Sequence, residues 1–198
     1  MKQQFAITLS NDIYPNMQKY YGFSDRDISF LCAIESLLMD TKLERINTRD
    51  LCKEAKRGKD ALYSNYRSKD GLIDFLVSKI CKFLASLWRV EDGRVFIDMD
   101  EEIIQFMLTW SELLPNFRKI VIWKMETDKS FYSEEEDLLK NSELSLRRKN
   151  KFIIARYGIK GAIDSWLYSS KRTDQGISES ARFFANEIES LTDWINSD

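Results

Sequence analysis

Histidine is absent from this sequence, and this absence narrows the chemistry open to the chain. It removes the usual general base of serine and cysteine hydrolases and the commonest side-chain ligand of zinc. The sequence also has no GxSxG elbow and no glycine-rich loop that would cradle a phosphate. We therefore expect a protein that is not an enzyme and that holds no metal and no built-in cofactor.

Cysteine is scarce, and long apolar runs are missing. The three cysteines, Cys32, Cys52 and Cys81, form no CxxC pair, which argues against a zinc finger. Their odd number argues against a disulfide framework and is typical of a reducing compartment. No run of about 18 apolar residues predicts a membrane span, and the first ten residues are too polar for a signal peptide. These features favour a cytoplasmic protein.

Proline and glycine are also few, with 2 and 7 among 198 residues, whereas a β-rich chain needs many turns. The 43% of hydrophobic residues is enough for a sizeable core. We predict an all-α fold with an N-terminal arm over residues 1–23, a three-helix head over residues 24–70 and a helical body over residues 71–198. A loop is expected over residues 90–99.

Polar residues mark the helix starts of the predicted head. Ser24, Asn47 and Ser68 each precede a helical pattern and are good N-caps, and Asp27 and Asp50 stand at the N3 positions of the first two helices. We therefore predict helices over residues 25–41, from residue 47 onward, over residues 59–66, and from residue 68 onward. The second and third are short and are joined by Lys56-Arg57-Gly58, the layout of a helix-turn-helix.

Positive charge is concentrated on the same segment. Residues 42–82 contain 11 Lys and Arg against 6 Asp and Glu, a net charge of +5. The whole chain has 30 against 32, so the remaining residues have 19 against 26, a net charge of −7. A basic head on an acidic body is the electrostatic pattern of a DNA-binding protein.

The head resembles that of the tetracycline-repressor-like (TetR) transcription regulators. The most specific element is the series Tyr63, Tyr66, Lys69 and Leu72, at a spacing of three residues. Apolar pairs in the first helix and a weaker match at Tyr157-Gly158 and Trp166-Leu167 add to the resemblance. The turn departs from the family: Lys56, Arg57 and Gly58 replace a glycine, an apolar residue and a serine, so that Lys56 is expected to adopt a positive φ.

The resemblance implies a DNA interface on the second and third helices. Lys59, Asp60, Ala61 and Ser64 are the candidates for contact with base edges. Tyr63 and Lys69 are expected to bind phosphates, with Arg49, Lys56 and Arg57 beside them. The complete predicted set is Asn47, Thr48, Arg49, Lys56, Arg57, Lys59, Asp60, Ala61, Tyr63, Ser64 and Lys69.

The resemblance also implies that the body senses a small molecule, whose identity the sequence leaves open. Aromatic residues suited to an apolar pocket are numerous in the body. The predicted set is Trp88, Phe106, Trp110, Phe117, Trp123, Phe131 and Tyr132. Aromatic residues at helical spacing are also those of an ordinary core, and this alternative stays open.

The last two helical patterns are predicted to form a homodimer interface. Gly158 and Gly161 reduce helix propensity, and close approach of another helix is one reason for their presence. The predicted interface comprises Gly158, Ala162, Ile163, Trp166, Leu167, Phe184, Ile188 and Leu191; packing within one chain is the alternative. For the basic run Arg147-Arg148-Lys149-Lys151 we predict a charged, solvated helix face rather than a second nucleic-acid site.

Two functions are compatible with these residues. The first is a TetR-like repressor that binds palindromic double-stranded DNA as a homodimer and is released by a small-molecule ligand. The second keeps the fold but acts mainly through a protein partner, as an adaptor or co-activator.

Overall fold

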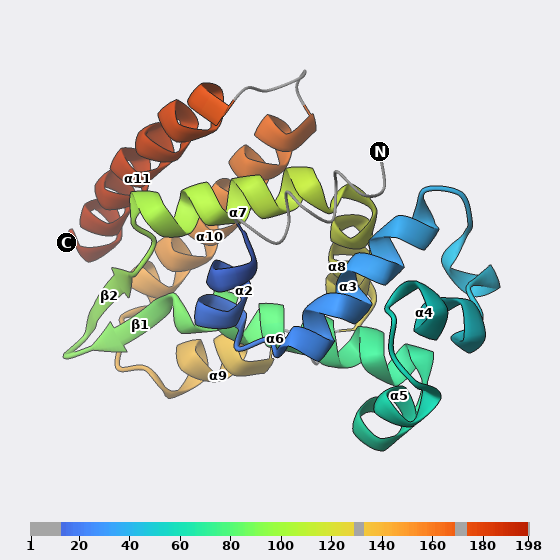
Figure 1. Ribbon diagram of the computed structural model, residues 1–198. Helices are drawn as coiled ribbons and strands as arrows, with labels where there is room; N and C mark the ends of the chain where they lie inside the picture. The colour runs from blue at the N-terminus through green and yellow to red at the C-terminus, as the bar shows by residue number, and fades with distance from the viewer. Residues whose placement is uncertain (1–12, 129–132, 169–173, 198) are drawn as a thin grey trace. The chain divides into compact units, whose positions relative to one another are not determined.

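The computed structural model describes residues 13–128, 133–168 and 174–197, and it is mostly helical (Figure 1). Its N-terminal elements are α2 (Tyr14–Tyr21), α3 (Asp25–Leu38), the 3-10 turn η2 (Leu43–Arg45), α4 (Thr48–Glu54), α5 (Lys59–Tyr66) and α6 (Lys69–Ser86). They are followed by β1 (Trp88–Glu91), β2 (Arg94–Ile97), α7 (Glu101–Leu113), α8 (Pro115–Thr127), α9 (Ser133–Asn141), α10 (Leu146–Tyr168) and α11 (Asp174–Asn196). None of the described helices has the length and hydrophobicity needed to cross a bilayer.

Packing divides the chain into two compact units. The first comprises Met1–Phe83 and Leu113–Phe131, and the second comprises Leu84–Glu112 and Tyr132–Asp198. Helix α8 thus lies in the first unit, where it packs on α3. The functional boundaries predicted at residues 24–70 and 71–198 stay predictions, because packing alone does not decide them.

Helix α2 lies in the segment predicted to be an N-terminal arm, and it contributes buried residues to the core of the first unit. Met17 and Tyr21 are buried, and the Tyr21 ring packs edge-on against Phe83 at a centroid distance of 5.3 Å. The helix ends at Gly22 with a φ of 62°, and the Lys79 ammonium donates a 3.2 Å hydrogen bond to the Gly22 carbonyl. Aromatic burial explains why this segment is ordered.

Helix α3 provides the central surface of the first unit. It begins with the predicted capping box: the Asp27 backbone N–H donates to the Ser24 hydroxyl, and the Asp27 carboxylate accepts from the Ser24 N–H. It ends at Leu38 rather than at residue 41, and η2 follows. Its Glu35 carboxylate is buried against the start of α8, where it accepts hydrogen bonds from Asn116 and Phe117.

The segment expected to be a loop over residues 90–99 contains a β-hairpin in the second unit. β1 and β2 pair antiparallel, with Trp88 opposite Ile97 and Glu91 opposite Arg94. The two turn residues, Asp92 and Gly93, have φ values of 49° and 69°. Both are positive, as a type I′ turn requires, and Asp-Gly is one of the dipeptides that favour this turn.

The end of α11 is fixed to this hairpin by side chains. The Asn196 amide pairs with both backbone groups of Val95, at 2.8 and 2.7 Å, and so occupies the edge of β2. The Lys151 ammonium donates to the carbonyls of Trp194 and Ser197 at 2.7 and 2.8 Å, where a cation complements the helix dipole. The prediction of a solvated face is therefore wrong for Lys151, which is only 7% exposed.

Candidate nucleic-acid interface

Helices α4 and α5 are packed into the first unit through a few apolar side chains. Leu51 of α4 and Leu62 of α5 are fully buried, and Tyr66 is 5% exposed. The start of α4 is capped as predicted, because the Asn47 side chain accepts a 2.9 Å hydrogen bond from the Asp50 N–H. The opposite faces of these two short helices are left exposed to solvent.

The turn between α4 and α5 closes on a lysine instead of a glycine. Lys56 has a φ of 52°, as expected, and its N–H donates to the Lys53 carbonyl at 3.2 Å. The Arg57 N–H donates to the Cys52 carbonyl at 2.9 Å. These two bonds form a Schellman motif in which the left-handed position is held by a residue with a Cβ atom, at a cost in free energy that glycine avoids.

Tyr66 fixes the orientation of α5. Its hydroxyl donates to the Asp27 carboxylate and accepts a 3.2 Å hydrogen bond from Arg26 Nε. Its ring packs edge-on against Phe30 at 5.8 Å. Burial, with the Asp27 hydrogen bond, raises the pKa of Tyr66 to about 12. One side chain thus connects the end of α5 to the capping box of α3.

Most of the residues predicted to contact DNA are exposed, on α4, the turn and the front of α5. Tyr63 is 49% exposed. Thr48, Ala61 and Lys69 are half-buried, and the exposed members are Asn47, Arg49, Lys56, Arg57, Lys59, Asp60, Tyr63 and Ser64. The predicted charge and exposure are therefore present together, with Lys56, Arg57 and Lys59 adjacent along the chain.

Two of the predicted phosphate contacts bind acceptors within the chain. The Lys69 ammonium donates to the carbonyls of Leu43 and Ile46, at 2.8 and 3.1 Å, and so holds η2 to the start of α6. The Arg57 guanidinium donates to the Ser29 hydroxyl at 3.0 Å. Both side chains have further donors, but their positions are set by these internal contacts.

Asn65 is an exposed polar residue of α5 that the predicted set of DNA contacts omits. Its side-chain amide donates to the Ala61 carbonyl at 2.8 Å and to the Ser64 hydroxyl at 3.0 Å. It stands one turn after Ala61 and is exposed. Helical spacing from Ala61 was the signal that could have identified it.

The turn from α5 to α6 is tight. Arg67 has a φ of 66°, and the Ser68 hydroxyl accepts a 2.9 Å hydrogen bond from the Gly71 N–H, as the predicted cap requires. A Cβ atom on Gly71 would lie 2.1 Å from the Tyr66 carbonyl oxygen. Glycine is needed at this position because the backbone of the preceding turn occupies the space.

The residues predicted to line a ligand pocket do not all belong to one unit. Trp88, Phe106 and Trp110 are buried in the second unit, and Phe117 is buried in the first. Trp123 is 52% exposed on α8, and Phe131 and Tyr132 lie outside the described residues.

The predicted dimer residues divide into exposed and buried groups. Gly158 and Ala162 are exposed on α10, whereas Ile163 and Leu191 are half-buried. Phe184 and Ile188 are 8% and 3% exposed within a single chain. The side chains of Trp166 and Leu167 lie outside the described part of the structure.

The described residues contain no group of three or more acidic or cysteine side chains that could hold a metal ion. Compared with known proteins, the chain matches no family model, and neither a curated protein nor a solved structure matches it significantly.

Proposed function

We propose that this chain is a TetR-like transcription regulator, a repressor that binds operator DNA through α4 and α5. The observation that supports this most is the exposed basic surface at the turn between the two helices, formed by Lys56, Arg57 and Lys59. A short helix beside such a surface, held on a small core by Leu62 and Tyr66, has the dimensions to enter a major groove.

Within this proposal, the front of α5 reads the bases. Lys59, Asp60 and Ser64 offer donors and acceptors at its exposed face, and Asn65 adds an amide of the kind that pairs with adenine. Tyr63, which is 49% exposed, donates its hydroxyl to a phosphate. Lys69 has a positioning role, since it holds the segment that precedes α4.

The proposal includes a homodimer formed through α10 and α11 of the second unit. Ile154 and Tyr157 of α10 are 61% and 65% exposed and share a face with Gly158 and Ala162. A Cβ atom on Gly158 would meet nothing within 4 Å. A second copy of the chain packed on this face would bury these exposed residues. It would also account for the glycine, which allows close approach of another helix. A two-fold dimer would place two heads about 34–36 Å apart, which calls for a palindromic operator.

Substitutions at Gly158 test the dimer. Gly158→Leu should leave the single chain folded, because the position is open and leucine has the better helix propensity by about 0.5–1 kcal/mol. It should block close helix contact, so that light scattering reports the monomer mass where the native chain gives twice that mass. Gly158→Ala is the milder control. A native chain that is monomeric at 100 µM would overturn the dimer.

DNA binding is tested by fluorescence anisotropy on the DNA upstream of the protein's own gene, at several salt concentrations. Lys56→Ala should weaken binding and reduce the slope of log K against log salt by about 2, one phosphate contact for each head. Lys82→Ala is the matched control, because Lys82 is exposed on α6 about 20 Å along the helix from Lys69. Absence of salt-dependent binding to any DNA would refute the proposal.

Release by a small-molecule ligand is the regulatory part of the proposal. Such a ligand would bind one arrangement of the heads better and so weaken DNA binding by a coupling free energy of about 1–3 kcal/mol. The same anisotropy assay in the presence of candidate ligands measures this coupling.

One observation favours a second function, an adaptor that acts through a protein partner. Arg57 and Lys69, two of the predicted phosphate contacts, bind acceptors within the chain. An adaptor would tolerate the loss of the exposed cations, so a reporter gene should respond normally to a chain carrying Lys56→Ala and Lys59→Ala. Loss of the response would exclude the adaptor.

A further inference from the structure

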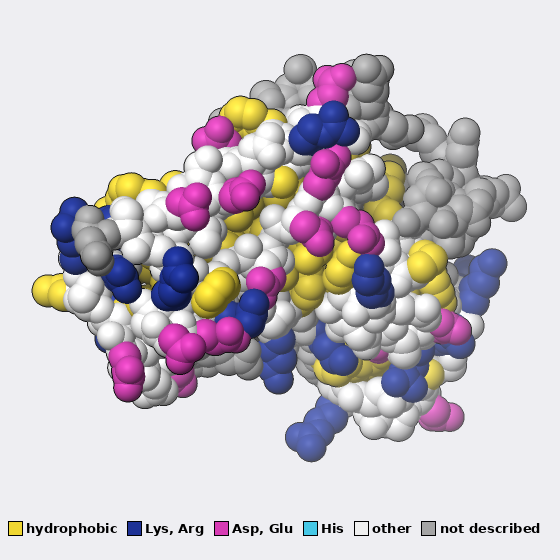
Figure 2. All heavy atoms as spheres, turned by 90° about the vertical axis from the view of Figure 1, so that its left-hand side faces the viewer, with side chains coloured by type: hydrophobic (Ala, Val, Ile, Leu, Met, Phe, Trp, Pro, Cys, Tyr) yellow, Lys and Arg dark blue, Asp and Glu magenta, His cyan; other side chains and the backbone are white. Residues whose placement is uncertain are grey.

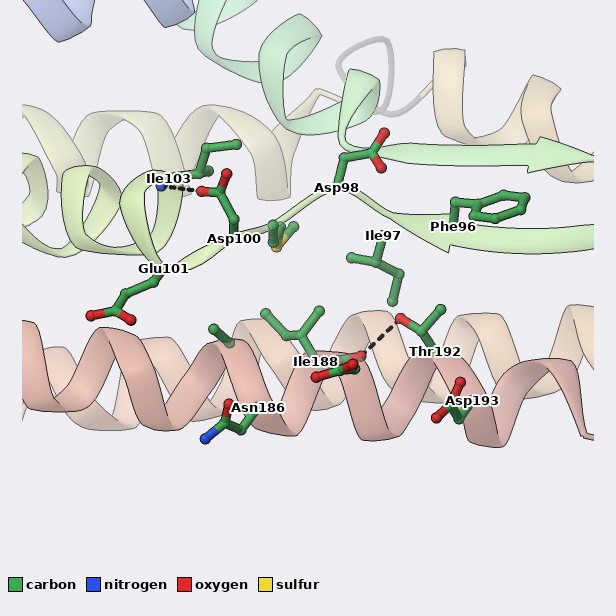
Figure 3. A pocket seen from close by; sticks show the side chains of 13 residues that line it. Phe96, Ile97, Asp98, Asp100, Glu101, Ile103, Asn186, Ile188, Thr192 and Asp193 are labelled. Atoms are coloured by element: carbon green, nitrogen blue, oxygen red, sulfur yellow. Dashed lines mark hydrogen bonds between the residues drawn. The ribbon is translucent and has the colours of Figure 1, made fainter.

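The second unit contains a groove that takes no part in the proposed DNA contacts. It lies between α11 and the segment that joins β2 to α7, and its volume is about 570 Å³. Figure 3 shows Ile97 of this segment directed toward Ile188 and Thr192 of α11. Ile97, Ile188, Met99 and Ile103 give the groove an apolar lining. This volume lies within the range of about 300–1,000 Å³ that is usual for small-molecule sites.

All the charged residues that line the groove are acidic. Its thirteen lining residues include five carboxylates and no lysine or arginine. On the face of the molecule shown in Figure 2, acidic side chains border hydrophobic ones. An apolar lining whose charged residues are all acidic disfavours anions and favours a ligand that is both apolar and positively charged.

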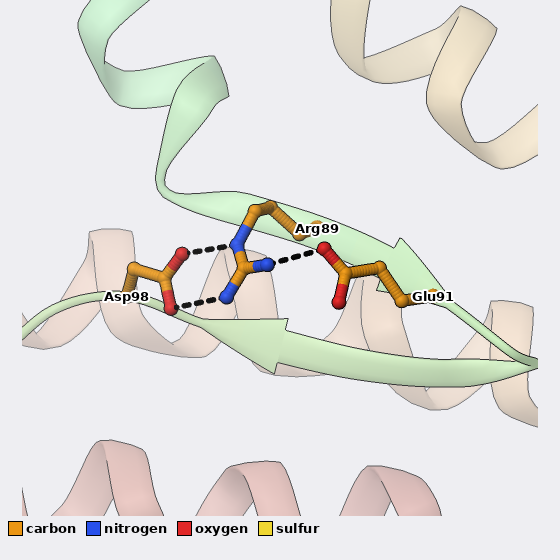
Figure 4. A network of polar contacts seen from close by, with 3 residues as sticks. All are labelled: Arg89, Glu91 and Asp98. Atoms are coloured by element: carbon orange, nitrogen blue, oxygen red, sulfur yellow. Dashed lines mark hydrogen bonds and ion pairs between the residues drawn. The ribbon is translucent and has the colours of Figure 1, made fainter.

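Three of the five carboxylates already have partners. Asp98 points away from α11 in Figure 3 and binds Arg89, which also binds Glu91 on β1 (Figure 4). Asp100 caps α7, where its carboxylate accepts a 2.8 Å hydrogen bond from the Ile103 N–H. Glu101 faces Arg182 at 3.5 Å. These three contribute little free charge to the groove.

Glu189 and Asp193 are the remaining two. They stand one turn apart on α11, so their Cβ atoms are about 6 Å apart. Among the described residues, neither side chain makes a hydrogen bond or an ion pair. These two unpaired carboxylates lie beside an apolar lining that contains no lysine or arginine. They therefore favour the binding of one positive charge.

We propose that this groove binds an organic cation with an apolar body. The body rests on Ile97, Ile103 and Ile188, and the positive charge lies beside Glu189 and Asp193. A divalent metal ion does not fit, because the described residues bring no three ligating side chains together. The inference concerns binding to the chain itself and is independent of whether the chain binds DNA.

Calorimetric titration of the full chain with tetraphenylphosphonium tests the proposal. Triphenylphosphine oxide, which is apolar but neutral, is the control ligand. The cation should bind saturably to one site per chain, and the neutral compound should bind at least tenfold more weakly. Glu189→Gln and Asp193→Asn should each weaken cation binding about fourfold, the effect of one unit charge at roughly 5 Å in a solvated groove.

Glu187→Gln is the matched variant, because Glu187 is exposed on the same helix and does not line the groove. It removes the same charge and should leave the affinity within twofold of the native value. Equal affinity in all three variants, equal binding of the two ligands, or no saturable binding of the cation would each overturn the proposal. Circular dichroism checks that each variant is folded.

Discussion

Removal of the buried charge at Glu35 should destabilise the first unit. Glu35 is 2% exposed, and its carboxylate accepts from the Asn116 side chain at 2.8 Å, the Phe117 N–H at 2.7 Å and the Asn116 N–H at 3.1 Å. It supplies the N-terminal cap that α8 lacks in its own sequence, where Leu114 holds the cap position. Glu35→Gln keeps the volume but replaces one acceptor oxygen with a donor that faces other donors.

The expected cost follows from these bonds. Hydrogen bonds to a charged group are worth about 1.5–3 kcal/mol each, and a buried donor left without an acceptor costs about 1–3 kcal/mol. Glu35→Gln should therefore lower the free energy of unfolding by about 2–4 kcal/mol, a large part of the stability of a typical domain.

Urea denaturation followed by far-UV circular dichroism measures this change. Glu54→Gln is the matched control. Glu54 is exposed at the end of α4, and its carboxylate accepts one 2.6 Å hydrogen bond from Ser36, the residue that follows Glu35 on α3. It should cost less than about 1 kcal/mol. A cost for Glu35→Gln no larger than that of the control would refute the argument that this carboxylate caps α8.

Three further substitutions test the turn and the anchor of α5. Lys56→Gly should raise the free energy of unfolding by about 1 kcal/mol in thermal or urea denaturation, because glycine adopts the φ of 52° without strain. Gly71→Ala should lower it by more than about 2 kcal/mol in the same assay, because its Cβ atom would overlap the Tyr66 carbonyl oxygen; a neutral result would mean that the turn can open to admit a methyl group. Tyr66→Phe should cost about 1–2 kcal/mol at pH 7 by loss of the bond to Asp27. The pKa of Tyr66 is raised from 10 in the unfolded chain to about 12 in the folded chain. The stabilisation that this shift provides is therefore complete below pH 10 and is lost as the pH rises toward 12. Between pH 10 and pH 12 the free energy of unfolding should fall less in Tyr66→Phe than in the native chain.

Local signals in the sequence predicted the helical part of the fold well. Ser24, Asn47 and Ser68 cap helices as expected. Asp100 likewise caps α7, and Pro115 begins α8. Each cap depends on a hydrogen bond between residues only three positions apart, which a sequence shows directly. The positive φ of Lys56 was expected because Lys56 stands where the family that the head resembles has a glycine.

Contacts between residues distant in the sequence account for most of what was missed. Glu35 reaches α8 across 81 positions, and Asn196 reaches Val95 across 101. No local pattern identifies such partners, because a carboxylate or an amide in a helix is usually solvated. The hairpin was different: its Asp-Gly turn was visible, but two four-residue strands are too short to show a clear alternation.

The candidate DNA interface illustrates the same division between local and distant contacts. Which residues of α4 and α5 are exposed followed from helical periodicity, and the exposed cations followed from composition. Lys69 binds the carbonyls of Leu43 and Ile46 only because η2 lies beside the start of α6. The spacing of residues along the chain does not specify this arrangement. A lysine at the start of a helix has two uses, an external phosphate or an internal carbonyl. Lys69→Met separates them: an internal role predicts a loss of stability without DNA, and a phosphate contact predicts a loss of salt-dependent affinity alone.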